Sequence, residues 1–364
     1  MKTTHSNKKP LSGLRILELE ALGPVPWACM VLADLGAEVV RVENPASRAT
    51  TDTYGTVLRG RTRVSLNLKV AHDREAFLRL AANADVLVEG MRPGAMERLG
   101  LGPDEIFQVN EQIVFARMTG WGQNGPMANE AGHDINYIAA AGILNAIGPE
   151  EKPSIPLNLI GDFAGGSCFL LIGLLSALHQ PRSERKRVVI DSAMVDGASV
   201  LMSLVYSRMH MGQWSDQRAA NPLDGGVPWY DTYLTQDRHR MAVGALEPKF
   251  YANLVDTLGL HDLPPRDDRS NWDAIRQAFE AAFATRSRDE WVELFRGVDA
   301  CVSPVLSMTE AVASPHLVTR GTFTQRDGEV VPAPAPIFNG NRYSLAHPAT
   351  FAESEDVIAN WNRH

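Results

Sequence analysis

The first third of the chain repeats one pattern, an apolar stretch followed by a helical stretch, and this pattern limits the possible folds more than any other feature. The apolar stretches that predict strands are 14–19, 38–42, 64–68, 85–89 and 113–117. The helical patterns between them are 27–35, 71–82 and 103–109. A strand, a helix and a second strand within about thirty residues form a parallel crossover unit. Repetition of this unit predicts an α/β protein with a large doubly wound parallel sheet of the Rossmann-like kind.

The length of the chain indicates a second domain, because 364 residues exceed what one hydrophobic core usually organises. We expect residues 1–211 to form the first part of the large domain. Residues 212–228, rich in Gly, Asn, Asp and Pro, predict a linker. A hairpin pattern and three helical patterns, the last with the capping box Ser287–Glu290, predict a smaller α+β domain over 229–312. Residues 313–364 then return to the large domain.

Charge and cysteine content exclude several classes of protein. The formal net charge is −8, whereas nucleic-acid-binding domains are usually basic, so no nucleic-acid partner is expected. Cys29, Cys168 and Cys301 lie far apart in apolar surroundings. They indicate buried, reduced thiols in a cytoplasmic protein, with neither a disulfide framework nor a metal site.

Three stretches bear on membranes and targeting. The longest apolar run, 168–178, is shorter than the roughly 20 residues of a bilayer span and predicts a buried helix. Residues 1–10 are basic and polar and lead into no apolar signal segment. Residues 362–364 do not match a peroxisomal address. We therefore expect a cytoplasmic chain without a membrane span.

The loop after the first strand argues against a nicotinamide ligand. Gly23–Pro26 cannot supply the G-x-G-x-x-G phosphate cradle of dinucleotide-binding sheets. Glu43, at the end of the second strand, resembles a ribose-binding acid, but we expect it to be a solvated strand-end charge. Nicotinamide binding is therefore not predicted.

Two short stretches place an ionisable side chain at a glycine-flanked junction ahead of an apolar helical run, Gly132–Tyr137 and Gly161–Ser167. Glycine lets a ligand approach the backbone, and a helix start offers free N–H groups. His133 and Asp162 are therefore candidates for a pair of proton-transfer groups. The plainer alternatives are a surface or core histidine and an aspartate that only caps a helix. The paired glycines after Asp162 weaken the second alternative, because they form helices poorly.

Positive side chains gather near the predicted carboxyl ends of the strands. They are Arg41, Arg59, Arg61, Arg63, Lys69, Arg92 and Arg98. Most such side chains are ordinarily solvated. Doubly wound folds, however, bind ligands at this edge of the sheet, so this cluster in an acidic chain predicts a phosphate-bearing ligand.

Several motifs resemble the family III CoA-transferase superfamily, and together they cover nearly the whole chain. They are residues 11–15, Gly23-Pro24, residues 34–43 and Arg92-Pro93-Gly94. Four further stretches resemble the α-methylacyl-CoA racemase branch of that superfamily. They are residues 132–137, 158–163, 244–248 and 299–305.

This resemblance implies an intertwined homodimer, with each active site between the large domain of one subunit and the small domain of the other. It implies that His133 and Asp162 are the acid/base residues, and that Glu247, by itself only a loop acid, supports His133. The CoA contacts that it implies are Arg41, Leu66, Asn67, Leu68, Lys69, Gly90, Met91, Arg92, Arg98, Gly132 and Tyr137. Two departures leave the substrate open: Asn67 replaces a usual Asp, and Glu20 stands where small residues are common.

The implied reaction is the interconversion of (R)- and (S)-2-methylacyl-CoA thioesters by 1,1-proton transfer through an enolate. One side chain of the pair removes the α-proton, and the other donates a proton to the opposite face. Backbone N–H groups at the helix start around Asp134 can stabilise the enolate oxygen. CoA is part of the substrate, and we expect no metal or redox cofactor.

Two other functions stay open. A CoA-transferase would use Asp162 as a nucleophile that forms an acyl anhydride and then a CoA thioester, and would have no use for His133. A non-catalytic protein on the same fold would bind acyl-CoA without proton exchange. The acyl chain is open as well, since sterol side chains, branched fatty acids and aryl-propionyl groups all fit. A methionine-rich segment, 202–214, could line an apolar groove, but such residues more often fill cores.

Overall fold

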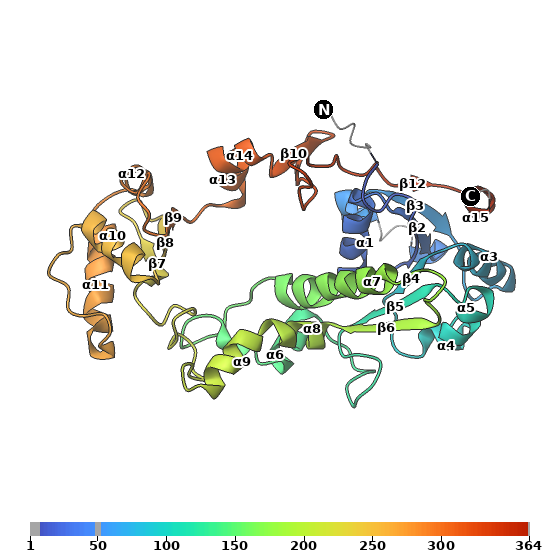
Figure 1. The fold of residues 1–364 in the computed structure, drawn as a ribbon, viewed down its shortest axis with the longest axis horizontal. Coiled ribbons are helices and arrows are strands. Elements are labelled where there is room, and N and C mark those ends of the chain that lie inside the picture. The colour runs from blue at the N-terminus through green and yellow to red at the C-terminus, as the bar shows by residue number, and fades with distance from the viewer. Residues whose placement is uncertain (1–7, 48–51, 363–364) are drawn as a thin grey trace. The chain divides into compact units, whose positions relative to one another are not determined.

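The computed structural model describes residues 8–47 and 52–362, which form two compact units (Figure 1). Unit 1 comprises Met1–Ala141, Pro156–Met202 and Gly321–His364, and unit 2 comprises Gly142–Ile155 and Ser203–Arg320. Most of the N-terminal stretch that is expected to lack a signal lies outside the described residues, as do the last two residues of the chain.

Unit 1 is built on a seven-stranded sheet in which every strand pair is parallel, so the predicted doubly wound sheet is confirmed. In spatial order the strands are β12 (Thr350–Phe351), β3 (Arg61–Ser65), β2 (Glu38–Glu43), β1 (Arg15–Leu19), β4 (Val86–Glu89), β5 (Val114–Thr119) and β6 (Val188–Ala193). The chain adds strands in one direction from β1 to β3 and then in the other direction from β4. The switch point between β1 and β4 is where open α/β sheets bind ligands.

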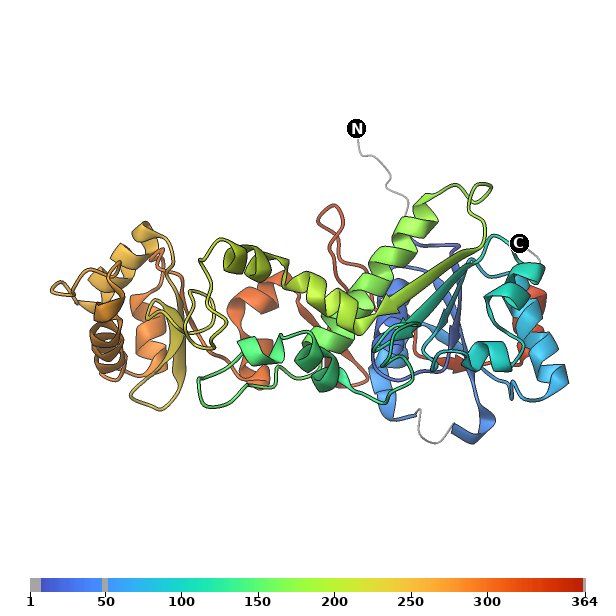
Figure 2. The ribbon, with the colours of Figure 1, turned by 90° about the horizontal axis from the view of Figure 1, so that it is seen from below.

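Helices cover both faces of this sheet and give unit 1 three layers (Figure 2). One face carries α3 (Ala71–Ala82), α5 (Pro103–Val109) and α15 (Ser354–Trp361). The other face carries α1 (Pro24–Asp34) and α7 (Phe169–His179). Successive side chains of a strand point to opposite faces, so Leu17 joins the first core and Ile16 the second.

Helix α1 begins at Pro24, three residues before the predicted start at Trp27. Proline fits the first turn of a helix because its missing N–H would have no intrahelical acceptor there. The remaining α-helices of unit 1 are α4 (Ala95–Arg98), α6 (Asp134–Ala140) and α8 (Met194–Leu201). The C-terminal segment adds a hairpin of β10 (Phe323–Arg326) and β11 (Glu329–Pro332).

A π-helix, η4 (Leu159–Cys168), leads without a break into α7. The combined helix, Leu159–His179, is the one helix among the described residues that is long and apolar enough to cross a membrane, by length and composition alone. A single helix of this kind is weak evidence for a span, because core helices pass the same test. The predicted buried helix is right for one face only: Leu170 and Leu174 are buried, whereas Ile172 and Leu175 are exposed.

Unit 2 contains an antiparallel sheet with an aromatic core. Its strands are β7 (Tyr230–Leu234), β8 (Arg240–Gly244) and β9 (Val302–Pro304). Its α-helices are α9 (Ser203–His210), α10 (Pro248–Leu258), α11 (Trp272–Phe283), α12 (Arg288–Leu294), α13 (Met308–Ala313) and α14 (Pro315–Arg320). Phe283 stacks on Tyr233 with ring centroids 5.2 Å apart. The predicted capping box at the start of α12 is present.

Unit 2 extends beyond the expected 229–312. It also takes in 142–155, α9, the predicted linker and residues 313–320, which end α13 and form α14. Arg218 explains part of this extension, since its guanidinium donates to the backbone oxygens of Asn145, Pro149 and Glu150. These hydrogen bonds join the segment predicted as a linker to residues 142–155. No local sequence pattern predicts this contact.

Candidate active site

A cavity of about 730 Å³ opens in unit 1 at the switch point of the sheet. Its walls come from the segments that follow β1, β4 and β5, together with the start of α6 and the first turn of η4. The lining includes Gly23, Gly90, Met91, Arg92, Met118, Trp121, Gly132, His133, Tyr137, Asp162 and Met194. The two side chains that were singled out as proton-transfer candidates therefore line one cavity.

His133 stands immediately before α6, in extended conformation, with its side chain exposed. Its backbone N–H donates to Asn136 Oδ1 at 3.0 Å, so His133 is held by the first turn of the helix that follows it. The placement agrees with the predicted junction ahead of a helical run. His133 is among the residues that line the cavity.

Asp162 lies inside the first turn of η4. It therefore does not occupy the cap position before the helix, which is the plainer alternative for this residue. Its Oδ2 accepts a hydrogen bond from Asn158 Nδ2 at 3.1 Å. Burial raises the pKa of its carboxyl, and the negative charge of Asp134 adds to this rise; the Asn158 bond and the proximity of His133 act in the opposite direction. A half-buried carboxyl with a raised pKa keeps its proton to a higher pH than an ordinary aspartate, which suits a group that must donate as well as accept a proton.

π-Helical turns are uncommon and often occur at functional sites, which fits the position of η4. Its glycines allow close packing: a Cβ at Gly165 would lie 2.6 Å from the backbone nitrogen of Ala198 in α8. The paired glycines near Asp162 are thus explained by helix packing. Trp27 of α1 stacks on Phe163 and covers the same turn.

Asp134 contributes a side chain that the sequence did not single out, since only its backbone was considered. The carboxylate is 5% exposed, and its Oδ2 accepts the backbone N–H of Asp162 at 2.7 Å. Within the described part of the chain, its Oδ1 has no hydrogen-bond partner. An acid in the first turn of a helix is so common that sequence alone gave no reason to select it.

Two aromatic rings form one wall of the cavity. Tyr137 and Trp121 meet edge to face with centroids 4.9 Å apart, and the Tyr137 hydroxyl donates to the backbone oxygen of Gly132 at 2.5 Å. Burial raises the pKa of Tyr137, and the charges of Asp162 and Asp134 raise it further. Gly120 is required here, because a Cβ at that position would lie 2.1 Å from the Tyr137 ring.

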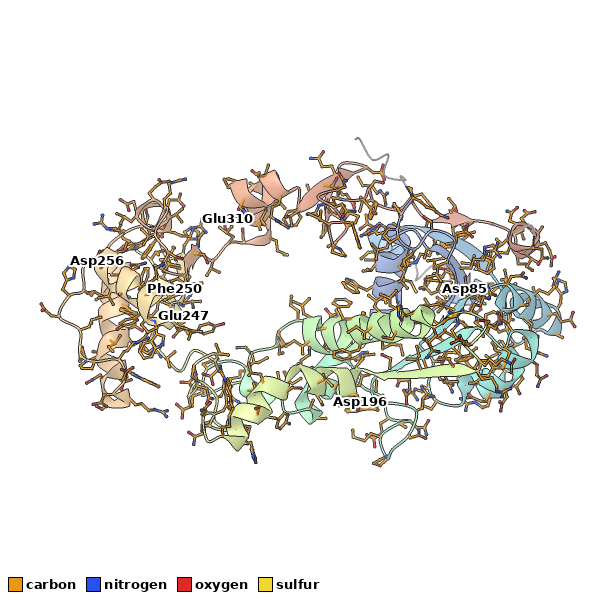
Figure 3. All side chains as sticks on the ribbon, viewed as in Figure 1. Asp85, Asp196, Glu247, Phe250, Asp256 and Glu310 are labelled. Carbon is orange, nitrogen blue, oxygen red and sulfur yellow. The ribbon has the colours of Figure 1, made fainter. Side chains whose placement is uncertain are left out.

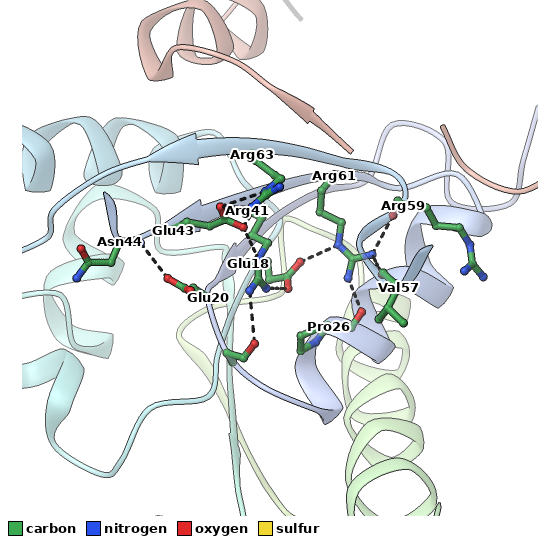
Figure 4. Close-up of polar contacts among 11 residues, drawn as sticks. Glu18, Glu20, Pro26, Arg41, Glu43, Asn44, Val57, Arg59, Arg61 and Arg63 are labelled. Atoms are coloured by element: carbon green, nitrogen blue, oxygen red, sulfur yellow. Dashed lines mark hydrogen bonds and ion pairs between the residues drawn. The ribbon is translucent and has the colours of Figure 1, made fainter. Parts of the chain in front are cut away.

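Four of the arginines predicted to face a phosphate instead neutralise buried carboxylates, and Figure 4 shows the ion pairs of three of them, Arg41, Arg61 and Arg63. Arg41 has no exposed surface and pairs with Glu18 and Glu43. The three other pairs are Arg61–Glu18 at 3.0 Å, Arg63–Glu43 at 2.9 Å and Arg59–Asp34 at 2.6 Å. Glu43 is 2% exposed, so its reading as a solvated charge was wrong.

This buried network also explains why β3 was misplaced. The strand was predicted at 64–68 and occupies Arg61–Ser65. Arg61 and Arg63 gave its first half a polar pattern, although both side chains are buried against glutamates. Periodicity arguments assume that charged residues face solvent, and this assumption fails wherever charges pair in a core.

The remaining CoA candidates separate into two groups. Gly90, Met91, Arg92, Gly132 and Tyr137 line the cavity. Leu66, Asn67, Leu68, Lys69 and Arg98 are absent from its lining. Leu66 and Leu68 are buried in the core beneath α3, whereas Lys69 and Arg98 are exposed. Asn67 shapes the turn after β3, since its Oδ1 accepts the backbone N–H of Lys69 at 3.2 Å.

Glu247 belongs to unit 2, where it precedes α10 with its side chain exposed (Figure 3). Its charge, together with burial, raises the pKa of Cys301. All three cysteines are free, but only Cys29 is buried; Cys168 is partly buried and Cys301 exposed, contrary to expectation. Among the residues described, no three His, Cys, Asp or Glu side chains group so that they could hold a metal ion.

Comparison with known proteins gives consistent matches over most of the chain. The family model "CoA-transferase family III" matches residues 11–350. "Alpha-methylacyl-CoA racemase" of Mus musculus is 43% identical over 329 residues, which are 90% of this chain and 85% of that protein. "Acetyl-CoA:oxalate CoA-transferase" of Acetobacter aceti is 30% identical over 349 residues, 89% of this chain and 88% of that protein.

Solved structures agree on the fold. A CaiB/BaiF family protein from Brucella suis has a TM-score of 0.82 and covers 98% of this chain and 99% of its own, at 23% identity. Rv3272 from Mycobacterium tuberculosis has a TM-score of 0.81 at 30% identity, covering 96% of this chain and 99% of its own.

Proposed function

The chain belongs to CoA-transferase family III, and from this premise we propose that it is an isomerase that interconverts (R)- and (S)-2-methylacyl-CoA thioesters. The observation that carries the proposal is that His133 and Asp162 line the same cavity at the switch point of the sheet. Racemisation needs one proton-transfer group on each face of the α-carbon, whereas acyl transfer needs only a nucleophile. The identity to a racemase of this family supports the same choice.

The two side chains exchange roles according to the handedness of the substrate. For one enantiomer His133 removes the α-proton and protonated Asp162 donates to the opposite face; for the other the roles reverse. The raised pKa of Asp162 suits this task, because a carboxyl fully ionised at neutral pH donates poorly. We infer that backbone N–H groups at the start of α6, around Asp134, stabilise the enolate oxygen.

The lining of the cavity suits an acyl-CoA. Met91, Met118, Met194 and Trp121 offer an apolar, polarisable surface for the acyl chain. Arg92 lines the cavity, and we assign it to a phosphate of CoA. The proton transfers require neither a metal nor a redox group, so we propose no cofactor beyond the CoA that the substrate carries.

A second copy of the chain is part of the proposal. Unit 1 exposes several large apolar side chains between residues 157 and 201: Leu157, Leu159, Ile172, Leu175, Val189 and Leu201. We infer that a partner surface covers them in water. A homodimer would provide it and would allow Glu247 of the partner subunit to support His133. Sedimentation velocity should therefore give a dimer at micromolar concentration; a monomer would contradict this part of the proposal.

We propose a cytoplasmic location on the basis of cysteine chemistry. All three thiols are free, and Cys301 is exposed. Exposed free thiols persist in reducing compartments.

The alternative function is CoA transfer, which is favoured by the identity to a CoA-transferase of the same family. One pair of assays separates the two functions. Solvent deuterium entering the α-position of a 2-methylacyl-CoA ester near pH 8 indicates racemisation. A hydroxylamine-sensitive acyl or CoA adduct on Asp162, without α-exchange, would contradict the proposal and identify a transferase.

A further inference from the structure

We propose that Asp134 is a positioning residue, whose carboxylate holds the proton-transferring Asp162 against α6, the helix that follows His133. This inference rests on the proposed function. Asp134 follows His133 directly and begins α6, while its Oδ2 accepts the backbone N–H of Asp162 at 2.7 Å. One side chain thus joins the two elements that carry the two acid/base groups.

Gly161, the residue before Asp162, leaves room for the hydrogen bond between Asp134 and the Asp162 N–H. A Cβ at Gly161 would lie 2.6 Å from Asp134 Oδ2 and 2.9 Å from its Cγ. Real side chains do not approach so closely, so only glycine lets η4 come near enough for the hydrogen bond. Glycine at position 161 is therefore required by the close contact between η4 and the Asp134 carboxylate.

A second contact prevents η4 from moving away. Gly165 and Gly197 let η4 and α8 meet backbone to backbone: a Cβ at Gly197 would lie 1.9 Å from the Gly165 carbonyl oxygen. Ser167 adds a hydrogen bond from its hydroxyl to the Pro24 carbonyl oxygen of α1 at 2.8 Å. The π-helix is fixed on these sides, so Asp134 determines where Asp162 sits relative to His133.

The other carboxylate oxygen gives Asp134 an electrostatic role as well. Asp134 is 5% exposed, and no described group donates to its Oδ1. A buried carboxylate oxygen without a donor is costly, and residues that bear such a cost often serve a site. The uncompensated charge lies beside Asp162 and favours its protonated form.

The groups that face Asp162 determine the sign of this effect. From α6 these are Asp134 and His133, and Tyr137, whose pKa Asp162 raises; η4 and its cap contribute Asn158. Gly23, which precedes α1, lies near the carboxyl as well, since a Cβ there would lie 3.2 Å from Asp162 Oδ2. Removing the charge of Asp134 therefore lowers the pKa of Asp162.

Asp134→Asn tests the electrostatic role, because the amide oxygen can still accept the Asp162 N–H while the charge is lost. We would label aspartate carboxyls with ¹³C in the full chain, assign Asp162 by its loss in Asp162→Asn, and titrate it by NMR. The expected result is a lower Asp162 pKa in Asp134→Asn. The matched control is Asp196→Asn, an exposed acid in the first turn of α8, which should leave the titration unchanged. An Asp162 pKa equal to that of the wild type in Asp134→Asn would overturn the electrostatic role.

This titration requires no turnover, so it reports on Asp134 even in a protein that exchanges no α-proton. Absence of exchange in the wild type would refute the proposed function but would leave the effect of Asp134 on Asp162 testable. Gly161→Ala tests the positioning role, and this test does not depend on whether Asp134→Asn folds. Its methyl group pushes Asp134 and Asp162 apart, and a shift of about 1 Å can cost on the order of a hundredfold in rate. We expect kcat for exchange to fall by about that factor with KM within about twofold. An unchanged kcat in Gly161→Ala would overturn the positioning role.

Discussion

Replacing Arg41 by methionine should destabilise the protein strongly without weakening CoA binding. Arg41 has no exposed surface and joins two buried carboxylates, Glu18 and Glu43. Loss of one partner of a buried ion pair typically costs about 3–5 kcal/mol, because the remaining charge stays buried. Each glutamate keeps one other arginine, Arg61 or Arg63, so we expect the lower end, about 3 kcal/mol.

The assay is thermal unfolding followed by circular dichroism. A unit of this size loses about 2–4 °C of midpoint per kcal/mol, so Arg41→Met should unfold roughly 10 °C below the wild type. Arg79→Met is the matched control: Arg79 pairs with Glu355, but the two side chains are 47% and 58% exposed, and solvent screens the pair. Its unfolding midpoint should not change measurably.

CoA titration calorimetry supplies the second readout, at a temperature where Arg41→Met is folded. Because the guanidinium is enclosed by protein, the CoA affinity of the variant should stay within about twofold of the wild type. The reasoning is refuted if Arg41→Met unfolds within about 2 °C of the wild type while its CoA dissociation constant rises about tenfold. That result would restore Arg41 as the ligand contact that the family resemblance implied.

Three further outcomes are expected. Gly120→Ala should cost about 1–3 kcal/mol of unfolding free energy in urea, because the new methyl group meets the Tyr137 ring; an unchanged urea midpoint would contradict the packing. The pKa of Glu310 is lowered from 4.5 to about 2, chiefly by Arg288, so this pair stabilises the fold above pH 4.5 and the stabilisation is lost as pH falls toward 2. The thermal midpoint of Glu310→Gln should therefore fall less steeply than that of the wild type across this window, and equal slopes would count against the pair. Because burial raises the pKa of Asp162, kcat/KM for the enantiomer whose α-proton Asp162 removes should decline on the acid side at a pH above the ordinary aspartate range; a decline within that range would contradict the raised pKa.

The sheet and its layers could be predicted because they depend on local periodicity. Apolar strands such as Val86–Glu89 and amphipathic helices such as Ala71–Ala82 carry their pattern in consecutive residues. The start of β3 could not be predicted, because Arg61 and Arg63 are buried by pairing with glutamates on β1 and β2. Burial of a charge depends on residues distant in sequence, and local patterns carry no information about them.

The site divides in the same way. His133 and Asp162 stand beside glycines and helix starts, so local sequence marked them, and both line the cavity. The role of Asp134 depends on a contact across 28 positions, and a first-turn acid is too common to select. The π-helical turn that carries Asp162 gave no signal either, because its glycines are explained by contacts with α8 that only the tertiary structure reveals.

The central claim is that an imidazole and a carboxyl act on one α-carbon, and the most direct test is α-proton exchange in deuterated solvent, followed by NMR on each enantiomer of a 2-methylacyl-CoA ester. The wild type should incorporate deuterium from both enantiomers and racemise them. His133→Ala and Asp162→Ala should each lose on the order of a hundredfold or more of the exchange rate, since general acid–base groups contribute that much, while CoA binding is retained. Exchange at the wild-type rate in either variant would contradict the two-base account.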